Sequence, residues 1–402
     1  MKEIVILGAG YAGLRALHFL QAKKGKFHIT LVDRNKYHYE SIELQEVAAG
    51  TQNKNRIIYP IKDIVSNQVT SFVQGTVRKI KRKEQKVILN DKKIIHYDFL
   101  IISLGFRSET FEIPGAEKNA LQLDDIESAE RIHSHLIEKM KHYKRVKDPN
   151  DLKIVVCGCG FTGIELLGEL CNSRRELSNI AGVKPKQIKL FTINSQKRLL
   201  PMLTESLVNY GVSYLGKKGV KFLTGKTIKE VFKNKVEYVD KVNVNKTGEI
   251  NSNTIIWTIG VSGSQVIQNS GFKQHRDRVM VRRDLRDPDF RNVYVIGDCS
   301  AVLDPSTNHP YPTTAQISLQ MGEQAAKNIL FQLKGKQTKK FKFSPLGIVA
   351  SLGRTNSLGN VGKFHLRGFL ASILKKFIAN KSLLSTGGIR ELFSKGRFDF
   401  YH

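Results

Sequence analysis

The hydrophobic and polar positions at the start of the chain predict a strand, a helix and a second strand. Residues 2–7 and 27–32 are short, mainly apolar runs, as expected of strands buried in a parallel sheet. Residues 14–20, which lie between them, have the apolar spacing of a helix. A strand, a helix and a strand in this order predict a βαβ unit.

The same order recurs in the middle of the chain. Residues 152–156 and 188–193 predict strands, and residues 164–170 predict the start of a helix. Each unit is followed later by a buried strand that ends in a glycine turn, at residues 97–105 and 254–260. We therefore expect an α/β fold with two tandem Rossmann-type units, each of which binds one dinucleotide.

Other periodic segments complete the pattern. Residues 145–150 are charged and contain Pro149, so we expect them to form a linker between the two units. Strands are also predicted at residues 69–73, 76–80, 86–89 and 293–298, and helices at residues 42–49, 124–144 and 313–332.

A glycine motif joins the first predicted strand to the first predicted helix. Gly8, Gly10 and Gly13 form a G-x-G-x-x-G sequence directly after the strand. The first glycine allows the tight turn, the second lets a pyrophosphate approach the backbone, and the third lets helix and strand pack closely. Asp33 ends the next strand, where a ribose-binding carboxylate belongs. This order predicts a dinucleotide site, and the ordinary alternative is a glycine-rich turn without a ligand.

The second unit repeats the glycine motif with one change. Gly158, Gly160 and Gly163 lie between the strand and the helix, as in the first unit. The following strand ends at Asn194 instead of an acidic residue.

The charge of the chain is far from balanced. Its 402 residues have a formal net charge of +29, and residues 323–402 contribute +12 of it. Such a surface attracts nucleic acid, anionic lipid or acidic partners. The first apolar run is already a strand, so we expect no signal peptide. No run of about eighteen apolar residues predicts a membrane-spanning helix.

The four cysteines suit a reducing compartment rather than a disulfide framework. Cys157 and Cys159 flank Gly158, and a C-x-C sequence in a nucleotide loop suggests a redox or metal-binding role. Further ligands near them are missing, so small residues that fit a tight turn are the favoured explanation. We predict no metal site.

The chain resembles the type II NADH:quinone oxidoreductases, the non-pumping respiratory dehydrogenases, essentially from end to end. Five motifs, together with Gln320 and Gly322, carry the resemblance. They are G-A-G-Y-A-G at residues 8–13, Y-H-Y-E at 37–40, G-F-T-G-I-E at 160–165, G-D-C-S at 297–300 and P-T-T-A-Q at 312–316.

The resemblance implies two bound nucleotides, FAD in the first unit and NADH in the second. It places the FAD at Gly8, Ala9, Gly10, Tyr11, Ala12, Gly13, Asp33, Arg34, Val77, Gly105, Asp298, Ala315, Gln316 and Lys375. It places the NADH at Gly158, Gly160, Gly163, Asn194 and Gly260. The helix that begins near Ala315 would direct its positive end at the flavin.

The resemblance also divides the chain into domains. Residues 1–149 and 266–335 would form the two parts of an FAD-binding domain, and residues 150–265 an NAD(P)H-binding Rossmann domain. Residues 336–402 would form a C-terminal membrane-association domain.

Three residues are candidates for catalysis by resemblance. Glu165 matches a family glutamate near the nicotinamide and the quinone route, although an acid in a first turn also simply stabilises a helix dipole. Gln316 and Gln320 are one turn apart, so both could line a channel, although such a pair is usually just surface polarity. The implied reaction passes a hydride from NADH to FAD and then two electrons and two protons to a lipid quinone, menaquinone or ubiquinone.

The tail carries an apolar stripe with basic flanks. The stripe consists of Leu366, Phe369, Leu370, Ile373, Leu374, Phe377 and Ile378, and we expect Gly387 and Gly388 to make a turn after it. Such a stripe is more often a core helix. Here it is aromatic-rich and follows the nucleotide domains, as in a helix that lies in a membrane interface. We expect a peripheral, monotopic protein on the cytoplasmic side of the cell membrane that binds its anionic surface.

Asn194 departs from the family pattern, which has a glutamate that binds the ribose hydroxyls of NADH. Asn194 removes a charge that would repel a 2′-phosphate, and Lys197 and Arg198 follow it. NADPH is therefore an alternative donor to NADH. The simpler explanation is that an asparagine binds the ribose nearly as well.

Other classes of protein remain as alternatives. A pyridine nucleotide–disulfide reductase needs a cysteine pair in its first domain, and residues 1–156 contain no cysteine. A sulfide:quinone oxidoreductase needs cysteines that converge on the flavin. A basic nucleic-acid or lipid-surface binding protein with a vestigial nucleotide fold is compatible with the charge, but no nucleic-acid motif is present, and we expect no nucleic-acid partner. The family resemblance also makes a homodimer an option.

Overall fold

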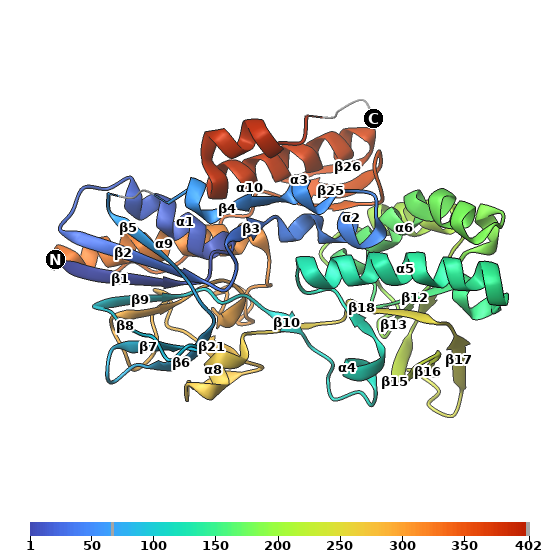
Figure 1. Ribbon diagram of the computed structural model, residues 1–402, viewed down its shortest axis with the longest axis horizontal. Coiled ribbons are helices and arrows are strands. Elements are labelled where there is room, and N and C mark those ends of the chain that lie inside the picture. Colours follow the sequence, from blue (N-terminus) through green and yellow to red (C-terminus); the bar gives the residue numbers. More distant parts are fainter. Residues whose placement is uncertain (66–67, 399–402) are drawn as a thin grey trace.

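The computed structural model describes residues 1–65 and 68–398. Two five-stranded parallel sheets form the two halves of the molecule, and the C-terminal segment lies along the top in Figure 1. The strand orders are β22-β9-β1-β2-β5 and β11-β18-β12-β13-β14. Both are doubly-wound arrangements, so the prediction of two Rossmann-type units is confirmed.

Most strands of the two sheets agree with the apolar runs of the sequence, but β11 and β14 were not predicted. The first sheet contains β1 (Lys2–Leu7), β2 (Phe27–Asp33), β5 (Thr70–Gln74), β9 (Phe99–Ile102) and β22 (Val293–Val295). The second contains β11 (Leu121–Gln122), β12 (Lys153–Cys157), β13 (Lys189–Asn194), β14 (Val220–Thr224) and β18 (Thr254–Trp257). The chain thus returns to the first sheet at β22, after it has completed the second.

Helices cover the sheets and bury their apolar faces. In the first half, α1 (Tyr11–Gln21) packs against α9 (Ala315–Leu333) so closely that a Cβ on Gly322 would lie 2.2 Å from the carbonyl oxygen of Ala12. In the second half, α5 (Ile126–Val146) packs against α6 (Phe161–Ala181). The remaining helices are α2 (Leu44–Ala49), α3 (Lys54–Ile57), α4 (Ala116–Asn119), α7 (Glu205–Lys217) and α8 (Gln265–Asn269).

Small antiparallel sheets connect and extend the two halves. Strands β10 (Arg107–Ser108) and β19 (Val261–Ser262) pair where the chain passes between the halves. The other small sheets are β3 (Tyr37–Tyr39) with β4 (Ile58–Pro60); β6 (Val77–Lys81), β7 (Lys86–Leu89) and β8 (Ile94–His96); β15 (Lys226–Phe232), β16 (Lys235–Asp240) and β17 (Thr247–Asn251); and β20 (Gln274–His275), β21 (Arg278–Met280) and β23 (Ser300–Ala301).

The structure differs from the predicted boundary at residue 149. Strand β11 pairs with β18, and α5 packs on α6, so both elements lie with the second sheet. The predicted linker is also shorter, because α5 continues to Val146 and a 3-10 turn occupies Pro149–Leu152. The polypeptide therefore crosses to the second half at β10, well before the second glycine motif.

The C-terminal segment contains a sheet that the sequence pattern did not reveal. Strands β24 (Ile348–Ser351), β25 (Ser357–Val361) and β26 (Phe364–Gly368) form an antiparallel meander, and α10 (Phe369–Lys395) follows. Leu366, predicted to lie in the helical stripe, is in β26. The turn expected at Gly387 and Gly388 is a kink inside α10, where Gly388 has φ 77° and ψ −171°. Residues 399–402 of the predicted membrane-association domain lie outside the described residues.

Candidate functional site

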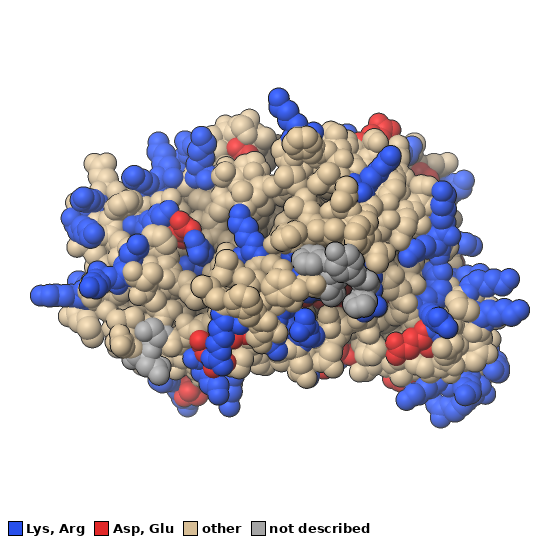
Figure 2. Space-filling model, turned by 90° about the horizontal axis from the view of Figure 1, so that it is seen from above, with Lys and Arg blue, Asp and Glu red and all other residues tan. Residues whose placement is uncertain are grey.

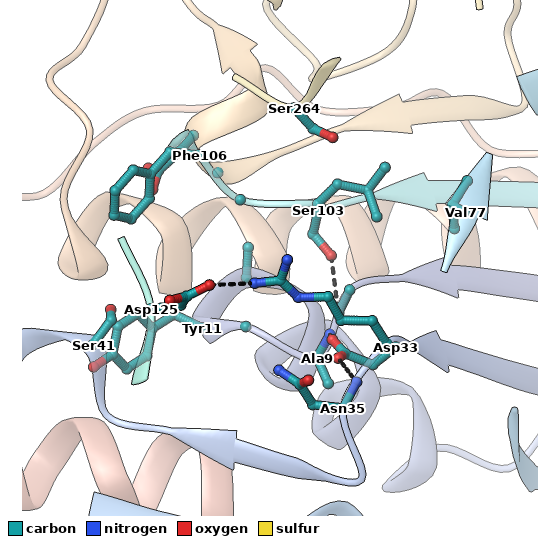
Figure 3. A pocket seen from close by; sticks show the side chains of 18 of the residues that line it. Ala9, Tyr11, Asp33, Asn35, Ser41, Val77, Ser103, Phe106, Asp125 and Ser264 are labelled. Atoms are coloured by element: carbon teal, nitrogen blue, oxygen red, sulfur yellow. Dashed lines mark hydrogen bonds and ion pairs between the residues drawn. The ribbon is translucent and has the colours of Figure 1, made fainter. Parts of the chain in front are cut away.

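A cavity of about 370 Å³ opens at the carboxyl ends of the strands of the first sheet (Figure 3). The loops after β1, β2 and β9 form its walls, which is where ligands bind in doubly-wound sheets. The predicted FAD residues that line it are Gly8, Ala9, Gly10, Tyr11, Ala12, Asp33, Arg34, Val77, Gly105 and Asp298.

The glycine motif has the geometry of a phosphate cradle. A Cβ on Gly8 would lie 2.3 Å from the carbonyl oxygen of Ser103, and a Cβ on Gly13 would lie 1.9 Å from the carbonyl oxygen of Gly8. Both positions therefore need glycine for the packing of the fold itself. A Cβ on Gly10 would meet no protein atom within 4 Å. The protein leaves open space there, so a ligand that approaches the backbone at the start of α1 fits this position.

Asp33 lies at the rim of this cradle with its carboxylate partly satisfied by the backbone. Oδ2 accepts a hydrogen bond from the Ala9 N–H at 2.6 Å, and Oδ1 accepts one from the Asn35 N–H at 2.8 Å. Burial raises the pKa of Asp33, and these hydrogen bonds oppose the rise. The arrangement fixes the carboxylate where it can accept from the hydroxyls of a ribose.

Asp298 faces the other end of the cavity. It lies in a 3-10 turn (Gly297–Cys299) after β22, beside Ser318 of the first turn of α9. Burial raises its pKa to about 6, and the nearby guanidinium of Arg278 opposes the rise. Arg278 is held by hydrogen bonds of 3.0 and 2.8 Å to the carbonyl oxygen of Ser300. A half-buried carboxyl group in the lining of the cavity fits the hydroxylated chain of a flavin nucleotide.

Further residues of the lining were missed by the sequence analysis. Ser103 could have been found, because it ends a buried strand beside the predicted glycine turn, and its hydroxyl donates to the carbonyl oxygens of Leu7 and Gly8 at 2.8 and 3.0 Å. The others come from loops that only the fold brings together, including Phe106, Asp125 and Ser264–Val266. Arg34 binds one of them, with Nη2 at 3.0 Å from Oδ2 of Asp125 (Figure 3).

The predicted glutamines lie elsewhere and bind the backbone of the C-terminal segment. The Gln316 side chain donates to the carbonyl oxygen of Gly347 at 3.3 Å and accepts from the Leu346 N–H at 3.0 Å. Gln320 exchanges hydrogen bonds of 2.8 and 2.9 Å with the backbone of Ser344. Both amides therefore fasten residues 344–347 to α9. For Gln320 this contact satisfies both ends of the amide, which favours a structural role over the predicted catalytic one.

The second glycine motif repeats the geometry of the first. A Cβ on Gly163 would lie 2.2 Å from the carbonyl oxygen of Gly158, and a Cβ on Gly160 would meet no protein atom within 4 Å. The hydroxyl of Thr258 donates to the carbonyl oxygens of Cys157 and Gly158, as Ser103 does in the first unit. Gly260 makes the predicted turn after β18, with φ 68°. The second cradle therefore has the same open space for a nucleotide.

Asn194 takes the place of Asp33 in the second cradle. Its Oδ1 accepts a hydrogen bond from the Cys159 N–H at 3.2 Å, and its Nδ2 donates to the carbonyl oxygen of Gln196 at 2.9 Å. Asn194 and Asp33 therefore occupy equivalent positions in the two cradles. The second cradle has a neutral amide where the first has a carboxylate.

Glu165 lies in the first turns of α6, facing the C-terminal segment. It is 6% exposed, and Oε1 accepts from the Ser351 N–H at 3.0 Å and from Nζ of Lys375 at 2.7 Å. A Cβ on Gly168, one turn further, would lie 2.4 Å from the carbonyl carbon of Leu352, so the C-terminal sheet packs directly on this helix. The ammonium group of Lys375 thus lies on Glu165, and its predicted contact with FAD stays a prediction.

The inner face of α10 is polar and covers a second, smaller cavity of about 50 Å³. A cluster of acids lies around it, with Arg397 forming ion pairs of 3.3 Å with Glu43 and 2.9 Å with Glu46. Burial raises the pKa of Glu43 to about 8 and that of Glu169 to about 7, and in both cases the neighbouring Glu46 adds to the rise. Charged and hydrogen-bonding groups therefore help to join the C-terminal segment to the nucleotide domains.

The four cysteines are all free thiols. Cys157, Cys159 and Cys299 are buried, and burial raises the pKa of every cysteine thiol in the chain. Cys157 and Cys159 lie at the packed turn of the second cradle, where small side chains fit.

Comparisons with known proteins agree with this geometry. A family model described as pyridine nucleotide-disulphide oxidoreductase matches residues 2–322. A type II NADH:quinone oxidoreductase of Staphylococcus saprophyticus is 38% identical over 401 residues, which is 99% of both chains, and one of Staphylococcus aureus is equally similar. The chain belongs to the type II NADH:quinone oxidoreductase family.

Solved structures share the fold of this type II family member. The structure of NDH2 from Plasmodium falciparum in complex with NADH has a TM-score of 0.85 at 18% identity and covers 98% of this chain and 97% of its own. The sulfide:quinone oxidoreductase of Aquifex aeolicus has a TM-score of 0.78, also at 18% identity, and covers 99% and 96%. At these identities the likeness shows a common fold, so the choice between the two activities rests on the sequence relatives.

Proposed function

We propose that the protein transfers electrons from NADH through FAD to a lipid quinone and pumps no protons. The observation that carries this proposal is the pair of glycine cradles in a chain that is 38% identical to type II NADH:quinone oxidoreductases over 99% of its length. The first cradle suits a resident flavin nucleotide, because loops from several separate parts of the chain line its cavity of about 370 Å³. The second, on the α6 side, suits a nucleotide that binds and leaves.

The residues of the first cavity fit FAD. Gly10 leaves room for the pyrophosphate, Asp33 would accept from the adenosine ribose, and Asp298 would bind the ribityl chain. Arg34 and Val77 line the end of the cavity that would hold the adenine. When bound, FAD supplies a carrier that accepts a hydride and gives up electrons in pairs. The protein contributes orientation and the positive end of α9, which begins at Ala315.

Glu165 and Lys375 would serve the quinone side of the reaction. Their ion pair joins the helix of the nucleotide cradle to the C-terminal helix. Quinone reduction consumes two protons, and a buried carboxylate with a hydrogen-bonded ammonium partner can hold a proton beside the acceptor. Gln316, whose amide binds the loop at 346–347, would position the wall of this site rather than transfer protons itself.

The outer face of the C-terminal segment supports a membrane-bound protein. The buried face of α10 contains Ser372, Asn380 and Thr386, whereas its exposed face is apolar, which reverses the polarity of an ordinary surface helix. The exposed apolar side chains of the segment include Phe364, Phe369, Leu370, Phe377, Leu384, Ile389, Phe393 and Phe398, each 42–76% exposed. Such a face fits a bilayer interface, where the surroundings are apolar.

Basic side chains surround this apolar face. Figure 2 views the molecule from this side, and Lys and Arg gather toward its two ends and lower edge, around a broad area with few charges. The exposed basic residues of the C-terminal segment include Arg354, Lys363, Arg367, Lys381 and Arg390. Each cation near an anionic headgroup contributes about 1 kcal/mol to binding. Among the described helices, none is both long and apolar enough to cross a bilayer.

We place the protein on the cytoplasmic side of the membrane, since its four free thiols fit a reducing compartment. The quinone is menaquinone or ubiquinone, and the homodimer stays a prediction.

An anaerobic titration tests the proposed function. The purified protein should carry one flavin per chain, NADH should bleach its visible band, and a soluble quinone should restore it. A flavin that sulfide reduces and NADH does not would overturn the donor. A flavin that NADH reduces and quinone does not reoxidise would overturn the acceptor.

A further inference from the structure

The second nucleotide site lacks the negative charge that its twin in the same chain possesses. Asp33 and Asn194 occupy equivalent positions, each at the end of the second strand of its unit and each accepting from the second N–H of its glycine loop. The carboxylate of Asp33 accepts from two backbone N–H groups, whereas the amide of Asn194 accepts from one and donates from its other end. A carboxylate at this position repels a 2′-phosphate on the adenosine ribose, and an amide does not.

Cations are gathered next to Asn194. The stem of Lys197 lies over Gly225, at the end of the neighbouring strand β14, where a Cβ would be 3.2 Å from Cγ of the lysine. The Lys241 N–H donates to the carbonyl oxygen of the same Gly225 at 2.8 Å, and its Nζ lies 3.2 Å from Oε1 of Gln196. The two lysines therefore stand together at the carboxyl ends of β13 and β14, the edge on which the ribose of a Rossmann nucleotide lies.

No carboxylate of the described residues pairs with the ammonium groups of Lys197 and Lys241. Asp240 directly precedes Lys241 in the sequence. Its carboxylate forms an ion pair with Lys226 at 2.5 Å and accepts hydrogen bonds from the backbone N–H groups of Val242 and Asn243. The guanidinium of Arg198 donates one hydrogen bond, to the carbonyl oxygen of Leu203 at 3.3 Å, and the residue is exposed. The charges beside Asn194 thus remain available to an anion.

We propose that the second nucleotide site accepts NADPH as well as NADH, with the 2′-phosphate held beside Asn194 by Lys197 and Lys241. The inference rests on the proposed function, since it concerns the donor of that reaction. The balance of the reaction is the same for both donors. The nicotinamide loses a hydride and leaves as NADP⁺ or NAD⁺, and the quinone gains two electrons and two protons, one of which comes from water.

Equilibrium binding tests the inference independently of quinone turnover. Calorimetric titration of the flavin-loaded protein with adenosine 2′,5′-bisphosphate and with 5′-AMP isolates the contribution of the 2′-phosphate. We expect the wild type to bind the bisphosphate at least as tightly as 5′-AMP. Asn194→Glu should lower the affinity for the bisphosphate relative to that for 5′-AMP at least about tenfold, because the new carboxylate and the 2′-phosphate are both negative.

A matched control for Lys197 and Lys241 lies at the opposite end of β13. Lys197→Ala combined with Lys241→Ala should weaken the bisphosphate and spare 5′-AMP, whereas Lys186→Ala, in the exposed turn before β13 at the other end of the strand, should change neither. Weaker binding of the bisphosphate than of 5′-AMP by more than about tenfold in the wild type would overturn the inference.

Anaerobic bleaching of the flavin separates this inference from the proposed function. Similar bleaching rates with NADPH and NADH, and a fall in the ratio of the NADPH rate to the NADH rate in Asn194→Glu, would support it. Bleaching by NADH and not by NADPH would overturn the inference and leave the proposed function intact. If neither donor bleaches the flavin, the proposed donor is wrong, and the bisphosphate titration alone then decides whether the site prefers a 2′-phosphate.

Discussion

Lys375 of α10 and Glu165 of α6 are 210 positions apart in the chain, and their side chains meet at 2.7 Å between Nζ and Oε1. The carboxylate is 8% and the ammonium stem 21% exposed, so the pair is largely withdrawn from water. The contact connects the helix of the donor cradle with the helix whose outer face is apolar. In the proposed function, the electron donor and the lipid-soluble acceptor would meet near this ion pair.

Removal of the carboxylate should impair the quinone half of the reaction. In Glu165→Gln we expect quinone-dependent turnover to fall at least about tenfold, because a positioned proton donor contributes at least that much. Bleaching of the flavin by NADH should be preserved. The exposed Glu176 lies on the same helix and provides the control Glu176→Gln. Unchanged quinone turnover in Glu165→Gln would refute the role of this residue.

Replacement of Lys375 distinguishes two roles of the lysine. If Lys375 acts through Glu165, Lys375→Gln should lower quinone turnover and retain the flavin, and its effect should not add to that of Glu165→Gln, since the two groups form one unit. Lys381→Gln, an exposed position on the same helix, serves as the control. A loss of bound flavin in Lys375→Gln, measured as the ratio of visible to protein absorbance, would instead support a direct contact with FAD.

Replacement of one glycine by alanine in either cradle should prevent nucleotide binding in that cradle alone. Gly10→Ala and Gly160→Ala introduce a Cβ into open space, so the protein should fold with a loss of about 0.5–1 kcal/mol from each helix cap. We expect Gly10→Ala to be purified without flavin, and Gly160→Ala to keep its flavin but resist bleaching by NADH. Gly13→Ala should fail to fold, because its Cβ would collide with the carbonyl oxygen of Gly8. The reverse pattern of flavin loss would exchange the two nucleotide assignments.

Polar substitutions on the outer face of α10 should release the protein from membranes. Leu370 and Phe393 are 69% and 76% exposed, so Leu370→Ser and Phe393→Ser leave the packing of the protein intact. Each should weaken sedimentation with anionic vesicles about tenfold, since burial of such a side chain contributes about 1.5–3 kcal/mol.

The membrane experiment has an internal control. Val244 is 67% exposed in a loop of the second half, and Val244→Ser should bind vesicles as the wild type does. Point substitutions are preferable to deletion of residues 363–402, because that deletion removes Lys375 and Arg397 from the protein interior. Equal sedimentation of all variants would refute a membrane-facing α10.

The buried carboxyl group of Glu169 should make stability depend on pH. Burial raises its pKa to about 7 from an ordinary value near 4.5, so the folded protein binds this proton more tightly than the unfolded chain does. Its stabilising contribution is therefore complete below pH 4.5 and is lost as the pH rises through about 7. Glu169→Gln should melt at a higher temperature than the wild type at about pH 8, with a smaller difference at about pH 5.

Thermal melts at several pH values check this prediction. The hydrogen bond of 2.6 Å from the Thr51 hydroxyl to Glu169 remains available to the amide of a glutamine. Glu176→Gln, on the exposed side of the same helix, should melt in parallel with the wild type at every pH. Parallel melting of Glu169→Gln would show that this carboxyl group titrates normally.

The sequence by itself determined the two nucleotide cradles. Short apolar runs followed by G-x-G-x-x-G fix a strand, a tight turn and a helix within about thirty residues, and such local patterns depend little on the rest of the chain. The positions of Asp33 and Asn194 followed from the same pattern, and the structure places both at the expected strand ends.

Only the tertiary structure decided what surrounds the cradles. The pairing of Lys375 with Glu165, the fastening of Gln316 and Gln320 to the backbone at 344–347, and the strands β24 to β26 all depend on segments far apart in sequence. The apolar stripe of the tail could not reveal its surroundings, because helical spacing shows that one face is apolar and not whether protein or lipid covers it. The fold shows that the rest of the described chain leaves this face uncovered, since α10 turns its polar residues inward and leaves Leu370 and Phe393 outside.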